Sequence, residues 1–190
     1  MCVWLAWRPD TNFFQTVLAA DRDLLRKLQQ RCCPYCGGRL DRADYPRKPR
    51  GDLDHAADTM EIRFSLCCAR EGCRRRLTPP SLRFLGRKVY YGAWVLVASA
   101  AWLCGAVLGR LIAGVPRRTV RRWQDWWCDG FTTTELWRAQ RALFMPPVDE
   151  LRLPLSLLER FADTPVEMIT GTLGFLRPVT TISAPRAMAF

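Results

Sequence analysis

Two pairs of cysteines constrain this chain more than any other feature of its sequence. The first pair, Cys33 and Cys36, lies in RCCPYCGGRL, with a proline inside the turn and two glycines after it. The second pair, Cys68 and Cys73, lies in FSLCCAREGCRRRL, where Gly72 precedes the second thiol. Short turns of this kind point two sulfurs to the same side, and two such turns supply the four thiolates of a closed tetrahedral site. We therefore predict a structural Zn²⁺ bound by these four cysteines.

Neighbouring residues compete for these ligand positions. Cys33 is preferred over Cys32 because it opens the turn, and Cys68 is preferred over Cys67 because it leaves four intervening residues before Cys73 rather than five. Substitution by Cys32 or Cys67 stays open, as does ligation by His55. Four thiolates leave no open coordination position, so the metal is expected to be structural rather than catalytic.

The arrangement of the thiols also indicates the compartment. The chain has nine cysteines, most of them clustered, and its N-terminus MCVWLAWRPD lacks the basic segment and the long apolar run of a secretory signal. Clustered thiols without a signal favour a reducing compartment and metal binding over disulfides. We expect a cytoplasmic, nucleoid-associated protein.

The remaining pattern predicts a mainly α fold with a small β zinc ribbon. Glu61–Leu66 alternates like a strand, with Ile62, Phe64 and Leu66 on one face, and Leu40–Tyr45 is its expected partner. Four regions follow: an N-terminal helical segment (1–30), the zinc ribbon (31–88), a helix-turn-helix-type helical domain (89–130) and a helical C-terminal region broken by prolines (131–190).

Val89–Gly109 is a run of twenty-one residues without a charge. Its length would suit a transmembrane helix. However, a single span would put the cysteine turns and the basic stretch that follows the run on opposite sides of a membrane, although both segments suit the same polyanion. We expect one or two buried helices here, and a single-span membrane protein remains the alternative.

The stretch GVPRRTVRRWQDWW (114–127) combines four arginines with three tryptophans. On a helix, Thr119, Val120 and the tryptophans fall on one stripe, and the arginines fall on the opposite side. Gly114 suits a tight turn and Pro116 suits the first position of a helix. This pattern predicts a helix-turn-helix whose second helix enters the DNA major groove. The arginines predicted to contact DNA are Arg117, Arg118, Arg121 and Arg122 on this helix, and Arg74, Arg75 and Arg76 after the second cysteine turn.

The overall charge agrees with a polyanionic partner. The net charge is +11, with 29 Lys and Arg residues against 18 Asp and Glu residues. Residues 39–122 carry all of this excess, since residues 123–190 are slightly acidic. Most of the cations are arginines, which bind phosphates and base edges well.

CPYCGG (33–38) followed by a strand and by CAREGCRRRLTPPS (68–81) resembles the N-terminal zinc ribbon of bacterial insertion-sequence transposases. GVPRRTVRRW resembles the helix-turn-helix of transposon-encoded proteins, and the stretch from Leu136 to Phe161 is similar to transposon-associated bacterial proteins. The resemblance implies a DNA-binding protein of mobile-element origin, either an accessory to a separately encoded transposase or a regulator. Its partner would be double-stranded DNA.

No catalytic arrangement is visible in the sequence. The chain leaves no room for a transposase catalytic domain, and no pair of a nucleophile and a base stands out. We therefore expect a protein that is not an enzyme. A protein-interaction adaptor, in which zinc only stabilises a small fold and nucleic acid is not bound, is the second hypothesis.

Overall fold

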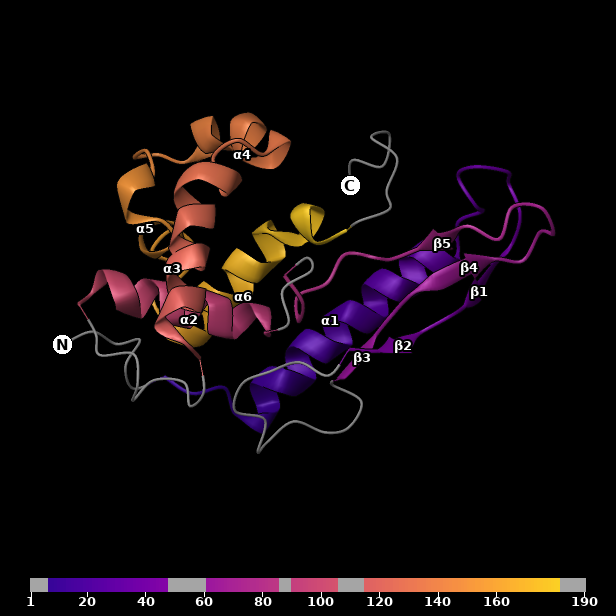
Figure 1. The fold of residues 1–190 in the computed structure, drawn as a ribbon, viewed down its shortest axis with the longest axis horizontal. Coiled ribbons are helices and arrows are strands. Elements are labelled where there is room, and N and C mark those ends of the chain that lie inside the picture. The colour runs from indigo at the N-terminus through magenta and orange to yellow at the C-terminus, as the bar shows by residue number, and fades with distance from the viewer. Residues whose placement is uncertain (1–6, 48–60, 86–89, 106–114, 182–190) are drawn as a thin grey trace.

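The computed structural model describes residues 7–47, 61–85, 90–105 and 115–181. As predicted, the fold is mainly helical with a small antiparallel sheet (Figure 1). In the N-terminal half the elements are α1 (Thr11–Gln29), β1 (Leu40–Arg42), β2 (Tyr45–Pro46), β3 (Ile62–Arg63), β4 (Leu66–Cys68), β5 (Arg76–Leu77) and α2 (Gly92–Leu103). The elements that follow are α3 (Arg117–Asp125), η4 (Trp126–Phe131), α4 (Glu135–Gln140), η5 (Arg141–Leu143), η6 (Glu150–Arg152), α5 (Leu155–Leu158), α6 (Pro165–Phe175) and η7 (Arg177–Thr180).

Helix α1 lies along the small sheet (Figure 1). It begins after Asp10, whose side chain accepts a hydrogen bond of 2.7 Å from the Phe13 N–H and so caps the helix. Its apolar side chains recur at helical spacing and are buried in one core with the leucines of the strands. The helix therefore supplies the hydrophobic support that such short strands lack.

The strands form two small antiparallel sheets, β1-β4-β5 and β2-β3. Leu40–Tyr45 pairs with the segment 62–68, as expected, but that segment is two strands rather than one. The interruption falls at Phe64–Ser65, where the Asp44 carboxylate accepts a hydrogen bond of 2.9 Å from the Ser65 N–H. The predicted alternation is wrong as well, because Arg63 and Ser65 are as buried as Phe64. Both faces of this segment are covered.

The described part of the apolar run is the buried helix α2. Every residue from Gly92 to Ala101 is buried, so the helix is covered on all sides. Within the described ranges of the chain, no helix is both long enough and apolar enough to cross a membrane. The prediction of a buried helix is thus confirmed for this part of the run.

Helix α3 crosses α2 instead of running alongside it (Figure 1). Thr119, Val120 and Trp123 are buried, as predicted, and the Gln124 side chain donates a hydrogen bond of 2.6 Å to the Ser99 carbonyl of α2. The helix continues directly into the π-helical turn η4, where Trp127 is fully buried. Trp126 is only half-buried, so the predicted tryptophan stripe is narrower than expected.

The C-terminal region consists of short helices separated near prolines, as the sequence predicts. Its core is a series of aromatic contacts, with ring centroids 5.2 Å apart between Trp127 and Phe131 and between Phe131 and Trp137. The series continues through Phe144 to Phe175.

A buried polar network joins α1 to the segment after the sheet. The Asp21 carboxylate accepts hydrogen bonds from the Ser81 hydroxyl (2.6 Å), the Leu82 N–H (2.6 Å) and Arg83 Nε (2.8 Å). The Ser81 N–H in turn donates to the Thr180 hydroxyl in η7 at 2.9 Å. The side chains of Asp21 and Arg83 are 1% and 0% exposed, so this ion pair is removed from solvent. The network ties three distant parts of the sequence together.

Candidate functional site

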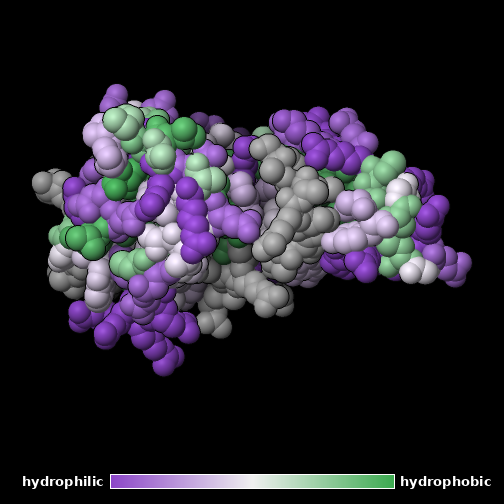
Figure 2. Space-filling model, turned by 90° about the horizontal axis from the view of Figure 1, so that it is seen from above, coloured by the Kyte–Doolittle hydropathy of each residue, from purple (hydrophilic) through white to green (hydrophobic). Residues whose placement is uncertain are grey.

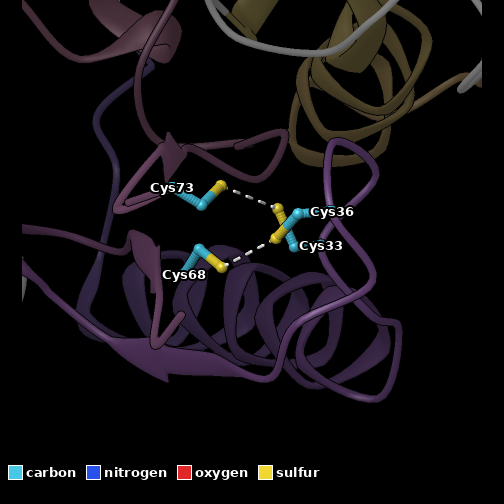
Figure 3. Close-up of side chains that lie close together, drawn as sticks. All are labelled: Cys33, Cys36, Cys68 and Cys73. Carbon is cyan, nitrogen blue, oxygen red and sulfur yellow. Dashed lines mark hydrogen bonds between the residues drawn. The ribbon is translucent and has the colours of Figure 1, made fainter. Parts of the chain in front are cut away.

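The sulfurs of Cys33, Cys36, Cys68 and Cys73 point toward one another from two facing turns (Figure 3). All four atoms lie within 4.8 Å of one another, with 3.8 Å between Cys33 and Cys73 and 3.4 Å between Cys36 and Cys68. A tetrahedron with metal–sulfur bonds of about 2.3 Å has sulfur–sulfur edges of about 3.8 Å. The four cysteines therefore lie close enough, and in a suitable arrangement, to bind one metal ion.

The backbone of the first turn places Cys33 and Cys36 on one side. The Cys33 N–H donates to the Gly38 carbonyl at 2.7 Å, and the Gly37 N–H donates to the Cys33 carbonyl at 2.8 Å. Gly37 has φ +71°, a conformation that suits glycine. A Cβ at Gly38 would lie 3.0 Å from the Cys68 sulfur, so this glycine lets the first turn approach the second pair.

The second turn is the connection of the β4–β5 hairpin. The Cys73 and Arg74 N–H groups both donate to the Arg70 carbonyl, at 3.1 Å and 3.2 Å, which closes the turn. The Cys68 N–H donates to the Arg75 carbonyl at 2.9 Å. Gly72 at φ +83° and Arg74 at φ +42° reverse the chain. The four-residue spacing of this pair therefore forms a compact turn.

Two thiols of the cluster, the half-buried Cys36 and the buried Cys68, have opposite electrostatic environments. A hydrogen bond from the Gly38 backbone lowers the pKa of Cys36 to about 7. Burial raises the pKa of Cys68 to about 12, against the opposing effect of a hydrogen bond from the Arg70 backbone. Metal binding requires thiolates, so a bound cation would have to displace the Cys68 proton. The cluster suits an ion that binds soft sulfur ligands strongly.

Two of the competing residues, Cys32 and Cys67, lie outside this cluster. Cys32 is exposed, and the Cys67 thiol donates to the Arg74 carbonyl at 3.4 Å. Successive strand residues point to opposite faces, so Cys67 turns away when its neighbour Cys68 turns inward. His55 lies outside the described residues.

Arginines surround the second turn, but they differ in their roles. The Arg76 guanidinium donates to the Ala43 carbonyl (2.9 Å) and to the Ser65 hydroxyl (3.1 Å), so it holds the sheet together. The Arg75 guanidinium lies 4.3 Å from the centre of the Tyr35 ring. Arg74 is exposed beside them. Of the three arginines predicted here, Arg76 is thus held by hydrogen bonds and Arg75 packs on an aromatic ring.

Sequence reasoning missed Arg70, which links the two turns. Its guanidinium donates to the Cys36 carbonyl at 2.7 Å, from one cysteine turn to the other. The signal was its position inside the Cys68–Cys73 loop. A cation there also offsets the negative charge that four thiolates leave around a divalent ion.

On α3, Arg117, Arg118, Arg121 and Arg122 are all exposed, on the side opposite the buried Val120 and Trp123. The Arg117 guanidinium lies 5.6 Å from the Trp102 ring. Among the residues that the structure describes, none of these four arginines forms an ion pair with a carboxylate. Gly114, the predicted turn residue before the helix, lies outside the described ranges.

The cysteine cluster and α3 lie toward opposite ends of the long axis of the molecule (Figure 1). The cysteine turns and the helix, which the sequence assigns to the same polyanionic partner, are therefore not adjacent. In the view from above, hydrophilic side chains cover much of both ends, and each end also has smaller apolar areas (Figure 2).

Comparisons with protein-family models, curated proteins and solved structures found no significant match to this chain.

Proposed function

We propose that this chain is a DNA-binding protein of mobile-element origin, in which a structural Zn²⁺ stabilises the sheet end and α3 contacts the duplex. It would act as an accessory to a separately encoded transposase or as a regulator. The observation that carries the proposal is the exposed face of α3, where four arginines have no carboxylate partner among the described residues. Unpaired guanidinium groups at one helix face suit phosphates and base edges.

The buried face of α3 also supports this role. Val120 and Trp123 are 0% and 5% exposed, so the helix is fixed on the core through one side only. A helix that reads DNA needs this rigidity, because its base contacts depend on a fixed orientation in the groove. The arginine side is left accessible to a partner.

Zn²⁺ is the metal that best fits the cysteine cluster. Four thiolates in a closed tetrahedral set select zinc or an iron–sulfur centre, and the short sulfur–sulfur distances match a single ion. With no open position, the ion would contribute stability rather than chemistry. This agrees with a binding protein that is not an enzyme.

The proposal is tested with a fluorescently labelled duplex and anisotropy measurements in a salt series. Affinity should fall steeply as salt rises, because each arginine–phosphate contact releases counterions. Replacing Arg117 and Arg118 with alanine should reduce the slope of log affinity against log salt by about two.

The control replaces two exposed arginines of α1, Arg22 and Arg26, with alanine, which removes the same charge from another part of the molecule. This variant should keep most of the affinity. Equal losses in the two variants would mean that only net charge matters. No affinity of the native protein for DNA would favour the adaptor hypothesis.

A further inference from the structure

A pocket of about 420 Å³ opens between the last turns of α1 and the C-terminal turn η7. Its apolar lining comes from Leu24, Pro80 and Pro178, and its charged lining comes from Lys27, Arg31 and Arg177. The volume falls within the range of about 300–1,000 Å³ that is typical of small-molecule sites. The pocket belongs neither to the cysteine cluster nor to α3.

The charge around this pocket has one sign. Among the residues that the structure describes, three cations line it and no carboxylate does. The position of Lys27 in the last turn of α1 could be explained by its favourable interaction with the negative end of the helix dipole. That explanation does not apply to Arg177, which comes from η7 and faces the same space. Lys27 and Arg177 therefore bring two like charges to one pocket from separate elements, and an anion bound between them would reduce their mutual repulsion.

The walls of the pocket are held by the buried network around Asp21. Pro80 precedes Ser81, whose hydroxyl donates to Asp21 of α1 at 2.6 Å. The Ser81 N–H donates at 2.9 Å to Thr180, which lies in the same turn as Arg177 and Pro178. These bonds fix α1, the segment around Pro80 and η7 relative to one another. A site with fixed walls binds without the entropic cost of ordering them.

We infer that this pocket binds a small amphiphilic anion, a molecule with a phosphate, sulfonate or carboxylate group on an apolar body. The cations would hold the anionic group, and the leucine and the two prolines would contact the apolar body. A concave pocket of this size suits a compact molecule, whereas the backbone of a duplex needs an extended surface. This ligand site is separate from the proposed DNA contact on α3.

The test uses the full chain and the fluorescent probe anilinonaphthalene sulfonate, which has an anionic group on an aromatic body. We expect saturable binding at one site per chain, with inorganic phosphate displacing the probe. Replacing Lys27 and Arg177 together with glutamine should weaken binding by about tenfold or more, since each charged hydrogen bond contributes substantially. All of these side chains are exposed at the rim, so the variant should fold normally.

The matched control replaces Arg22 and Arg26 of α1 with glutamine, which removes two charges outside the pocket. Equal weakening in this control, or unchanged binding in the Lys27 and Arg177 variant, would overturn the inference. Displacement of the probe by a short duplex more strongly than by inorganic phosphate would also overturn it, because the pocket would then be part of a DNA-binding surface. Probe binding that the pocket variant alone loses would support it.

Discussion

The two ends of the molecule are stabilised by different means. At the helical end, Trp127, Phe131 and Trp137 are at most 1% exposed and pack ring against ring. At the cysteine end, the strands of the three-stranded sheet contain only two or three residues each. A large aromatic core stabilises helices through burial alone, whereas a sheet of this size is marginal without further support. We therefore expect the cysteine end to depend on the proposed metal site in addition to the support of α1, whereas the helical end should not.

Loss of the metal should therefore affect the two ends very differently, and this is the largest effect that we expect. Cys68→Ser removes a fully buried thiol of the cluster and should abolish the proposed stoichiometric zinc binding. A structural zinc site contributes an apparent free energy of about 10–16 kcal/mol in small domains, so the β4–β5 hairpin should lose order. Elemental analysis measures the metal, and hydrogen exchange measures the protection of each end.

Two neighbouring thiols provide the controls for this experiment. Cys67→Ser and Cys32→Ser change residues that lie outside the sulfur cluster, so both variants should retain one metal ion per chain. If Cys67→Ser lost the metal as completely as Cys68→Ser, the assignment of the ligands would fail. Equal loss of protection around Trp127 would show that the two ends do not differ as proposed.

Asp21 connects the two ends, and its removal should have the next largest effect. Asp21→Ala leaves the Arg83 guanidinium buried without its carboxylate and removes the acceptor of the Ser81 hydroxyl. Removing one partner of a buried ion pair lowers the free energy of unfolding by about 3–5 kcal/mol. Urea unfolding should show this loss, with the transition of the helical end separating from that of the sheet end.

The control lies two residues further along the same helix. Asp23 pairs with Arg26 on the surface, where both side chains are more than half exposed. Asp23→Ala should change the free energy of unfolding by no more than about 1 kcal/mol. A similar cost for the two substitutions would contradict the role given to the buried network.

The sequence predicted the features that depend on local spacing. The glycine-containing cysteine turns, the buried helix of the apolar run and the amphipathic character of α3 all follow from residues close together in the chain. The Asp21 network could not be predicted, because its partners Arg83 and Thr180 are far from it in sequence. The interruption of the predicted strand at Phe64–Ser65 could not be predicted either, because it also involves a residue distant in sequence. There the Asp44 carboxylate accepts a hydrogen bond from the Ser65 N–H. Long-range polar contacts leave no periodic signal.

Two glycines of α6 test the helical end alone, with the smallest effects. A Cβ at Gly171 would lie 2.7 Å from the Phe161 Cβ, whereas a Cβ at Gly174 would meet nothing within 4 Å. Gly171→Ala should therefore lower the free energy of unfolding by about 1–3 kcal/mol, because the added methyl group overpacks the contact with Phe161. Gly174→Ala should instead stabilise by up to about 1 kcal/mol, because alanine restricts the unfolded chain and favours helix.

The stabilities of these two variants should be measured by thermal unfolding with and without a chelator. The comparison tests whether the helical end depends on the metal. If the helical end is stabilised by packing alone, the difference between Gly171→Ala and Gly174→Ala should be the same in both conditions. A difference that shrinks when the metal is removed would show that α6 depends on the cysteine cluster. In that case the two ends would form one cooperative unit. Buried hydrogen bonds connect them from Thr180 through Ser81 to Asp21, and from Gly92 of α2 through Arg83 to Asp21.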